Sequence, residues 1–364
     1  MFIRIRGGCV GQEYTADRCF RLHFADMWGF AKKRIYMDYA SAPPVSHAAL
    51  KAMRDAERFV GNPGAIHAEG AEALKALDSA RERVALQLSV KPREIVFTSG
   101  LTESNNLAIV GHARALERTR RTLEGTHWLV SAIEHASVLD CFGEVERLGG
   151  TVEFIRPDAK GRITPEAVAK SLRKETVFVS IGWANNEIGT VQQLGKIQNV
   201  LEAYEKAHGT TVLFHTDAGQ APLYVPSTAH SLGVDLMSIG GNKLYGPHGI
   251  GALYIGKRAE IARTLQGGPQ ERRLRPGTES VALALGFAAA YEEVAKLRES
   301  EARRLRDIRD TMAEALEKGI LGLVVNGDLS HALPHMLNIS IPDIQSESLP
   351  LLLYRAGIPT STNS

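Results

Sequence analysis

Residues 95–106 read IVFTSGLTESNN, a short apolar segment followed by a Ser-Gly turn and a run of helix-compatible residues. The first four residues, Ile95 to Thr98, have the β-branched and aromatic character of a buried strand. Ser99-Gly100 interrupts that pattern, and a helix is expected to begin near Thr102 with Glu103 in its first turn. The stretch therefore predicts a strand that enters a helix through a tight turn.

The same alternation of strand and helix continues on both sides of this unit. Before it, Leu74, Leu77, Val84 and Leu88 recur near helical spacing and end at the breaker Lys91-Pro92. After it, a second helix is expected over 138–150, and strand-like segments occupy 128–135, 151–157, 176–184, 211–218, 236–241 and 251–256. Such alternation predicts an α/β fold: a mostly parallel, doubly wound sheet covered by helices on both faces. We assign this sheet to a large domain over residues 35–280, with 35–45 expected to join a smaller one.

The smaller domain, which with its connecting helix is assigned to residues 281–364, is expected to be α+β and to lack its C-terminal part. A long helix over 281–318 begins apolar and becomes heavily charged, as expected for a connection between two domains. Two short strands, at 321–327 and 336–342, and a helix at 347–357 follow it. Residues 1–34 show no globular pattern and are predicted to be an extension outside the fold.

The composition excludes several functional classes. Among 364 residues, 44% are hydrophobic, enough for a substantial core, and the net charge of +2 is too small to indicate nucleic acid or a membrane surface as the main partner. No apolar run reaches the roughly 18 residues that span a bilayer. The three cysteines have no CxxC spacing, which favours a reducing cytoplasm, and no metal site is expected.

Unusual polar residues follow several of the predicted strands. The turn at 99–102 exposes backbone N–H groups suited to a phosphate, although a cap without a ligand would look the same. His135 follows the next strand, and its imidazole could stack on a planar ring or simply be hydrogen-bonded. The amides of Asn185-Asn186 could hold a phenolic oxygen, yet Asn-rich turns are also common without ligands.

Two further strand ends complete the pattern. Asp217 follows a buried strand, where a carboxylate needs a partner such as a protonated ring nitrogen, and Gln220 lies three residues on. Lys243 lies among glycines in SIGGNKLYGPHGIGALYI, residues 238–255, where the backbone is built for close approach. A phosphate cradle, an acid for a ring nitrogen and a lysine amine together indicate pyridoxal phosphate chemistry. Because strand ends gather ligands in such sheets, these residues predict one site.

The chain resembles the cysteine desulfurases, in the class V aminotransferase branch of the fold-type-I pyridoxal phosphate enzymes. The resemblance covers roughly residues 35–364 and rests on the ordered segments IYMDYASAPPV, GNPGAIH, EIVFTSGLTESNNLAI, EHASVLD, NNEIGTVQ, FHTDAGQ, NKLYGPHGIGALYI, LRPGTES and NGDLSHALPHMLNIS.

The resemblance implies a role for each matching residue. Lys243 would bind the cofactor aldehyde covalently and move the substrate's α-proton, and His135 would stack over the ring. Asp217 would pair with the ring nitrogen, while Asn186 and Gln220 would contact the ring hydroxyl. The phosphate would be bound by Thr102, the backbone around Leu101 and Asn242. In a homodimer, Thr278 of the neighbouring subunit would also reach it.

The sequence departs from the family beside the lysine. The family usually reads Ser-Gly-His-Lys, whereas Gly240 and Asn242 occupy the serine and histidine positions here. Losing a hydroxyl removes one hydrogen bond to the phosphate, and an amide cannot carry positive charge. We therefore expect weaker cofactor binding than in a typical member.

A larger departure concerns sulfur. In the family a mobile-loop cysteine attacks the substrate sulfur, and the sequence ends at Ser364, before that cysteine would occur. Cys141 lies on a predicted helix and is interpreted as a small core residue, while Cys9 and Cys19 lie in the N-terminal extension. The sequence thus predicts the cofactor half of the reaction with little or no sulfur transfer.

The predicted function is that of a pyridoxal-5′-phosphate-dependent cysteine desulfurase, which converts L-cysteine to L-alanine and passes sulfur to an acceptor. The expected partners are L-cysteine, a second copy of the chain and a sulfur acceptor such as an iron–sulfur scaffold protein, in the cytoplasm. Two alternatives stay open: another class V aminotransferase or lyase, and a non-catalytic partner protein that keeps the fold.

Overall fold

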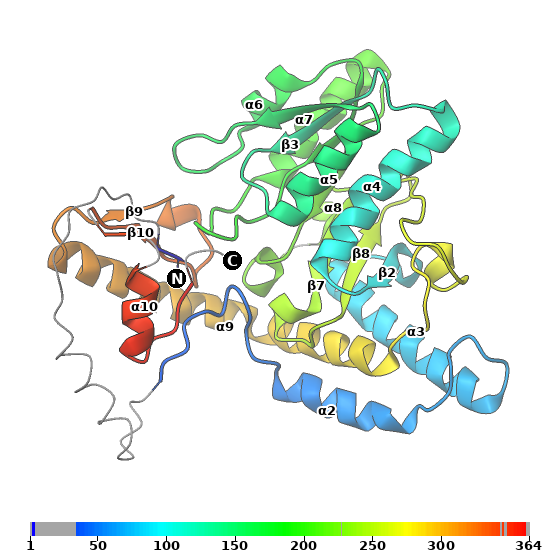
Figure 1. The fold of residues 1–364 in the computed structure, drawn as a ribbon, viewed down its shortest axis with the longest axis horizontal. Helices are drawn as coiled ribbons and strands as arrows, with labels where there is room; N and C mark the ends of the chain where they lie inside the picture. Colours follow the sequence, from blue (N-terminus) through cyan, green and yellow to red (C-terminus); the bar gives the residue numbers. More distant parts are fainter. Residues whose placement is uncertain (1, 4–33, 227, 343, 346–347, 362–364) are drawn as a thin grey trace, which may run out of the picture.

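The computed structural model describes residues 2–3, 34–226, 228–342, 344–345 and 348–361. Within these residues the chain forms one large and one small β-sheet with helices around them (Figure 1). The strands are β1 (Phe2–Ile3), β2 (Ile95–Thr98), β3 (His127–Ser131), β4 (Thr151–Ile155), β5 (Thr176–Ser180), β6 (Leu213–Asp217), β7 (Leu236–Gly240), β8 (Gly251–Ile255), β9 (Val324–Val325) and β10 (Asn338–Ser340). The α-helices are α2 (His47–Asp55), α3 (Ala68–Leu88), α4 (Leu101–Arg120), α5 (Ala136–Arg147), α6 (Pro165–Ser171), α7 (Leu194–His208), α8 (Ala229–Leu232), α9 (Val281–Gly319) and α10 (Ser348–Arg355).

The large sheet has seven strands in the order β2-β8-β7-β6-β5-β3-β4. Strand β8 runs antiparallel to both of its neighbours, β2 and β7, and the other neighbouring strands pair in parallel. The order is not the chain order, because helices cross over between parallel strands. The predicted α/β fold with a mostly parallel, doubly wound sheet is confirmed.

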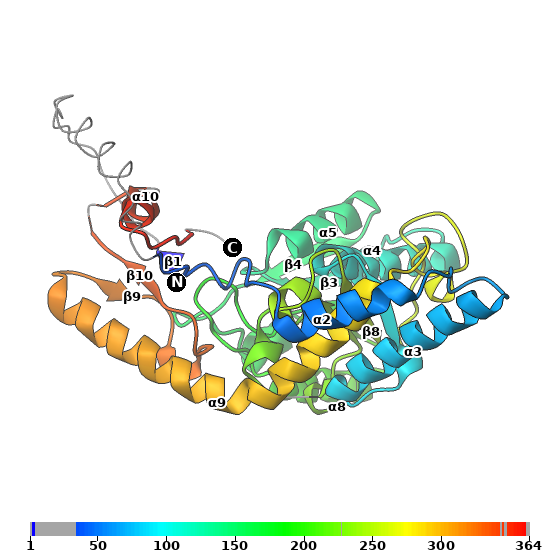
Figure 2. The ribbon, with the colours of Figure 1, turned by 90° about the horizontal axis from the view of Figure 1, so that it is seen from below.

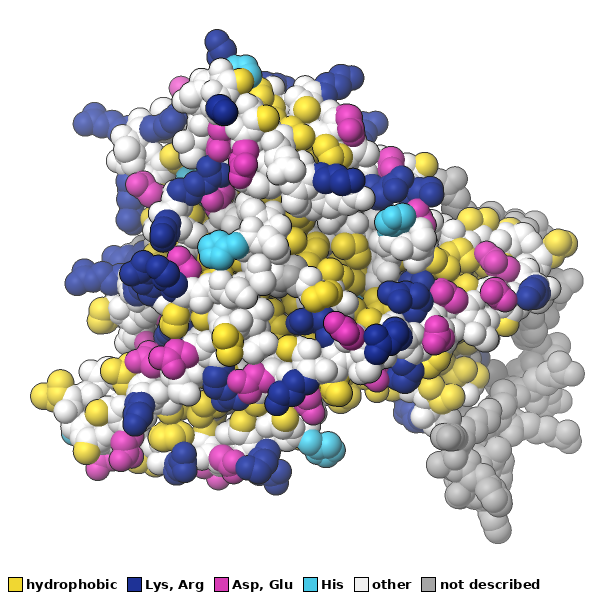
Figure 3. Space-filling view, turned by 180° about the vertical axis from the view of Figure 1, so that it is seen from behind, with side chains coloured by type: hydrophobic (Ala, Val, Ile, Leu, Met, Phe, Trp, Pro, Cys, Tyr) yellow, Lys and Arg dark blue, Asp and Glu magenta, His cyan; other side chains and the backbone are white. Residues whose placement is uncertain are grey.

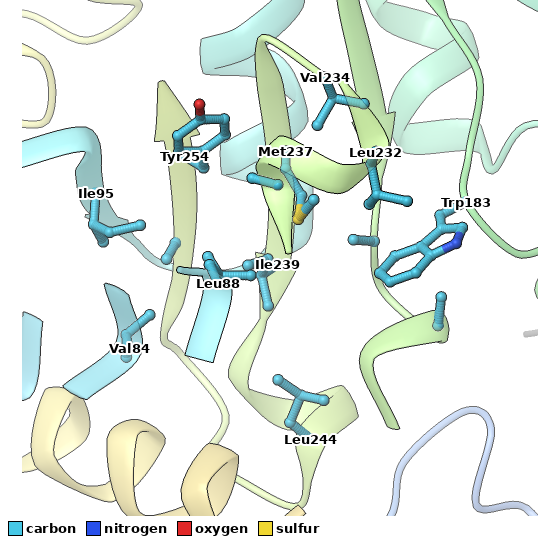
Figure 4. Close-up of a cluster of buried hydrophobic side chains, with 14 of the residues drawn as sticks. Val84, Leu88, Ile95, Trp183, Leu232, Val234, Met237, Ile239, Leu244 and Tyr254 are labelled. Atoms are coloured by element: carbon cyan, nitrogen blue, oxygen red, sulfur yellow. The ribbon is translucent and has the colours of Figure 1, made fainter. Parts of the chain in front are cut away.

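Two hydrophobic layers cover the two faces of this sheet. Along β5, Phe178 belongs to the layer under α4 and α5, and Val179 to the layer that contains residues of α3, α7 and α9. Leu213 and Phe214 of β6 divide in the same way, because successive side chains of a strand point to opposite faces. Figure 4 shows part of the second layer, in which Leu88 of α3 lies beside Ile239 of β7, and Val84 of α3 belongs to the same cluster. Burial on both faces explains why strands such as β3 and β7 are rich in apolar residues along their whole length.

Four helices, α2, α6, α7 and α8, were not predicted from the sequence. Helix α2 illustrates the reason: it has only nine residues, and Ala49 is the one that is buried, so the segment is short and contributes little to the core. The Ser46 hydroxyl accepts the Ala49 N–H and caps the helix, and α2 lies alongside α9 (Figure 2). A helix that is stabilised by a neighbour distant in the sequence carries a weak signal of its own.

Helix α9 connects the two sheets. It begins beside the large sheet and extends to the small one, where β10 lies between β1 and β9 (Figures 1 and 2). Ala313 of α9 packs there with Leu337, Ile339 and Ile341. Phe2 and Ile3 pair in parallel with β10, whereas the sequence placed residues 1–34 outside the fold. Backbone groups on a strand edge can pair with an added strand of any sequence, so composition could not reveal this. Residues 4–33, including Cys9 and Cys19, lie outside the described residues.

The surface carries charges of both signs. Figure 3 shows Lys and Arg side chains intermingled with Asp and Glu over the rear face, and hydrophobic side chains gathered near its centre. Within the described ranges, no helix combines the length and the apolar character that a membrane crossing requires.

A buried ion pair attaches the segment after β8 to the edge of the large sheet. Arg81 of α3 donates to both carboxylate oxygens of Glu271, at 2.7 and 2.6 Å, and the Phe97 N–H of β2 donates to the same carboxylate at 2.8 Å. The Glu271 side chain is only 1% exposed, so the charge has almost no access to water. The pair therefore holds the chain just before the LRPGTES segment, residues 274–280, against β2 and α3.

Replacing Arg81 by Met should destabilise the protein strongly, because it leaves the Glu271 charge buried without its partner. Such losses are about 3–5 kcal/mol, whereas breaking an exposed pair costs about 0–1 kcal/mol. Urea unfolding of Arg81→Met should be compared with Lys51→Met, which breaks the exposed Lys51–Asp55 pair. Equal losses in the two variants would contradict the structural role of Glu271.

Candidate functional site

A cavity of about 340 Å³ lies where several parallel strands of the large sheet end. Ligands of doubly wound sheets bind at this edge, because the connecting loops diverge there. Eight of the nine residues predicted for the site line this cavity: Leu101, Thr102, His135, Asn186, Asp217, Gln220, Asn242 and Lys243. The ninth, Thr278, does not line it and is exposed.

Lys243 enters the cavity from a 3₁₀ turn, Gly241–Leu244, directly after β7. Its amine donates hydrogen bonds to the carbonyl oxygens of Ala40 and Ser41, at 2.9 and 2.8 Å. Burial lowers the pKa of Lys243, and the nearby carboxylates of Asp217 and Asp38 oppose this shift. A lysine with a lowered pKa spends more time as the neutral amine, which is the nucleophilic form.

Asp217 occupies the end of β6 and is held by two donors. Asn105 Nδ2 donates to Oδ2 at 2.7 Å, and the Gly219 N–H donates to Oδ1 at 2.8 Å. Burial raises the pKa of Asp217, while these two hydrogen bonds and the nearby His135 and Lys243 act in the opposite direction. The carboxylate is thus oriented and suited to a cationic N–H partner inside the cavity.

His135 is the N-cap of α5 and belongs to the same hydrogen-bonded chain. Its Nδ1 accepts the Ser137 N–H at 3.1 Å, so in this arrangement Nδ1 carries no proton. The Ser137 hydroxyl lies 2.9 Å from Nδ1 and accepts from Asn105 Nδ2 at 3.0 Å. Asn105 therefore links the imidazole of His135 to the carboxylate of Asp217.

The N-terminus of α4 forms another wall of the cavity. Gly100 is its N-cap, and the turn is pressed onto β8: a Cβ at Gly251 would lie only 2.7 Å from Gly100 Cα. Glu103 accepts the Ser99 N–H at 2.5 Å and pairs with Arg275 at 3.1 Å. The N–H groups of the first helical turn have no acceptor within the helix and suit an anion.

The amide side chains of the cavity differ in their surroundings. Gln220 is 4% exposed and donates from Nε2 to the Ala40 carbonyl at 2.8 Å. Its Oε1 is buried and has no hydrogen-bond partner among the described residues, which leaves a polar group available for a ligand. Asn186 and Asn242 both line the cavity.

The sequence reasoning missed two residues of this site. Asn105 was quoted within the SNN run but received no role, although the side chain is fully buried against Asp217. Glu134 is the first residue of the quoted segment EHASVLD and received no role, yet it also lines the cavity. The signal that could have identified them is their position: Asn105 lies near the start of α4, and Glu134 lies just after the end of β3. Which partner each would meet depended on the packing of β5 and β6.

Glu134 is a half-buried acid close to Asp217. Its Oε1 accepts the Gly182 N–H at 2.8 Å. Burial raises the pKa of Glu134 to about 8, the Asp217 charge adds to the increase, and hydrogen bonds from Gly182 and Ser131 reduce it. Glu134 and Asp217 line the same cavity and lie close to each other, so both cannot easily be ionised, and Glu134 is mainly protonated at neutral pH.

This raised pKa predicts how stability should depend on pH. Unfolded Glu134 releases its proton near pH 4.5, whereas the folded protein keeps it up to about pH 8, so folding loses stability as pH rises through this window. Glu134→Gln removes the effect and can keep the Gly182 hydrogen bond. The melting temperature of the cofactor-free variant, relative to wild type, should therefore rise across this window and level off above it.

The matched control for this titration is Glu57→Gln, at an exposed glutamate outside the cavity. Its melting temperature should follow that of wild type at every pH. A constant difference between Glu134→Gln and wild type across the window would show that Glu134 ionises normally.

Comparison with known proteins shows which proteins the chain is similar to. The model of the family described as aminotransferase class-V matches residues 35–362. Cysteine desulfurase IscS of Dictyoglomus turgidum is 39% identical over 335 residues, which cover 92% of this chain and 82% of that protein. Cysteine desulfurase IscS 1 of Archaeoglobus fulgidus is 37% identical over 331 residues, covering 90% and 83%.

Solved structures show the same similarity. A structure titled NifS-like protein superposes with a TM-score of 0.84 at 33% identity, covering 90% of this chain and 87% of that chain. A structure titled SspA in complex with cysteine has a TM-score of 0.77 at 32% identity, covering 91% and 90%.

Proposed function

The chain belongs to the class V aminotransferases, within their cysteine desulfurase branch, and we propose from this that it is a pyridoxal-phosphate-dependent cysteine desulfurase. The observation that carries the proposal is one cavity that joins the Lys243 amine, the oriented Asp217 carboxylate and the N-terminus of α4. The substrate would be L-cysteine, and the products L-alanine and a sulfur atom transferred to an acceptor.

The residues of the cavity fit pyridoxal phosphate. The α4 N-terminus with Thr102 and Asn242 suits the phosphate, Asp217 suits the ring nitrogen, and the unpartnered Gln220 Oε1 is available near the Lys243 wall. When bound, the cofactor supplies an electron-withdrawing ring that stabilises negative charge at the substrate α-carbon. The negative charge of Asp217 would keep a proton on the ring nitrogen, which strengthens that effect.

Lys243 has two tasks in this proposal. As a neutral amine it would bind the cofactor aldehyde covalently, and once displaced by the substrate amine it would take up the α-proton. The carbonyls of Ala40 and Ser41 accept hydrogen bonds from Nζ and so limit where the amine can reach. His135 would lie over the ring, oriented by Ser137.

Sulfur transfer needs a nucleophilic thiolate, and the described lining of the cavity contains no cysteine. Cys141 is 3% exposed, and burial raises its pKa to about 12, so it forms little thiolate at neutral pH. It packs in the layer under α4 and α5, as the sequence predicted for a core residue. Because Cys141 is unsuited to this role, we keep the prediction that sulfur transfer by this chain is slow.

The proposal includes a homodimer with shared sites in the cytoplasm. Thr278 is exposed and does not line the cavity of its own chain. It follows Glu271, which attaches this part of the chain to the large sheet, and it is available to a second copy of the chain. The sulfur would pass to an acceptor protein such as an iron–sulfur scaffold.

The covalent bond predicts a yellow protein that borohydride bleaches irreversibly. Lys243→Ala should lose the absorbance of the lysine-bound cofactor and should incorporate no reduced pyridoxal label by mass spectrometry. Lys51→Ala, at an exposed lysine on α2, should behave like wild type. A colourless wild-type protein, even after incubation with the cofactor, would favour the non-catalytic alternative.

Incubation with L-cysteine and a thiol reductant tests the reaction itself. We expect α-proton exchange with solvent deuterium, detected by NMR, with sulfide and L-alanine formed far more slowly. Both signals should vanish in Lys243→Ala. Sulfide release that keeps pace with the exchange would refute the sulfur-transfer deficit, and exchange with other amino acids in preference to cysteine would favour another class V reaction.

A further inference from the structure

The side chain of Leu101 lies in a corner between two glycines at the strand ends. A Cβ at Gly240 would lie 2.8 Å from Leu101 Cγ and 2.9 Å from Cδ1, and a Cβ at Gly219 would lie 2.8 Å from Cδ1. Carbon atoms without a bond do not approach so closely, so a side chain at either position would require Leu101 to move.

Backbone conformation does not explain these glycines. Gly240 has φ −113° and ψ 129°, ordinary strand values that any residue adopts, and Gly219 is not among the described glycines with positive φ. What excludes a side chain at position 240 is therefore the leucine that faces it.

The corner borders the end of the cavity that suits an anion. Leu101 is the first residue of α4, and a Cβ at Gly240 would also lie 3.0 Å from Asn242 Oδ1. A serine at position 240 would bring its Cβ within 3 Å of the leucine side chain. Donors to an anion must therefore come from the first turn of α4 and from neighbouring polar side chains.

We propose that Leu101 and Gly240 form a mutually dependent pair that positions the phosphate-binding end of the site. The leucine side chain sets how closely the start of α4 rests on the ends of β6 and β7. Because the leucine leaves no room for a side chain at position 240, the phosphate of a pyridoxal-phosphate-type ligand is bound instead by backbone N–H groups of α4, Thr102 and Asn242. The ligand part of this inference rests on the proposed function, whereas the steric part does not.

The pair predicts non-additive effects of substitution. Gly240→Ser alone overpacks the corner, and Leu101→Ala alone leaves a gap under the α4 turn. Together the two changes fit, because the serine occupies space that the shortened side chain vacates, and its hydroxyl can then reach the phosphate.

The four proteins of this double-mutant cycle should be compared by two measurements. The first is the melting temperature of each cofactor-free protein, and the second is the dissociation constant for pyridoxal 5′-phosphate by fluorescence titration. We expect each single variant to melt lower than wild type and to bind about tenfold more weakly, and the double variant to recover most of both losses. Affinity for pyridoxal, which lacks the phosphate, should change little in any of them.

A control glycine separates this effect from serine substitution in general. Gly143 lies on α5 with no atom within 4 Å of a Cβ placed there, so Gly143→Ser should leave cofactor affinity unchanged. If Gly240→Ser does not fold alone, recovery of folding in the double variant supports the pair, and failure of both overturns it.

Additive effects on melting temperature and affinity would overturn the inference, as would equal losses for pyridoxal and its phosphate ester. A wild-type protein that binds no pyridoxal 5′-phosphate would instead defeat the proposed function. The melting temperatures of the cycle would still decide whether Leu101 and Gly240 depend on each other.

Discussion

The site depends on how closely the turn before α4 rests on the ends of the central strands. Gly100 approaches Gly251 of β8 so closely that a Cβ there would nearly touch its Cα, and Leu101 fills the corner between Gly219 and Gly240. This contact brings the N–H groups of the first helical turn to the same edge of the sheet as Asp217 and Lys243. Without the glycines the helix start would have to lift away, and the anion-binding and ring-binding parts of the cavity would separate.

The second organising feature is a set of ionisable groups kept from water in one cavity. Asp217, Glu134 and Lys243 all line it, and burial acts against the charged form of each. Both carboxyl groups accept hydrogen bonds, but only Asp217 also has His135 and Lys243 acting to lower its pKa, so it retains its charge more easily. Glu134 is left as the neutral acid, and the amine of Lys243 is held by the carbonyls of Ala40 and Ser41, which lie about two hundred residues away in the chain. The result is one anionic partner for a ring and one amine for an aldehyde.

Much of this arrangement could be predicted from the chain alone. All seven strands of the large sheet were expected near their observed positions, because each is a short run rich in β-branched and apolar residues between turn residues. The polar residues directly after those runs then had to meet at one edge. Helix α2 and the acid Glu134 were not predicted in this way, since their surroundings come from α9 and from Gly182, which are distant in sequence. The pairing of Phe2–Ile3 with β10 was missed for the same reason.

By itself the sequence determined the class of fold, the strand ends that carry the chemistry and the family to which the chain is similar. These follow from local patterns: apolar runs, breakers and the order of short motifs. Only the tertiary structure decided that Asn105 joins His135 to Asp217, that Gln220 has an unpartnered oxygen and that Leu101 occupies the corner over Gly240. Such facts depend on distances between strands and helices far apart in the chain, because van der Waals contact and hydrogen bonding act over a few ångströms in space, whatever the separation in sequence.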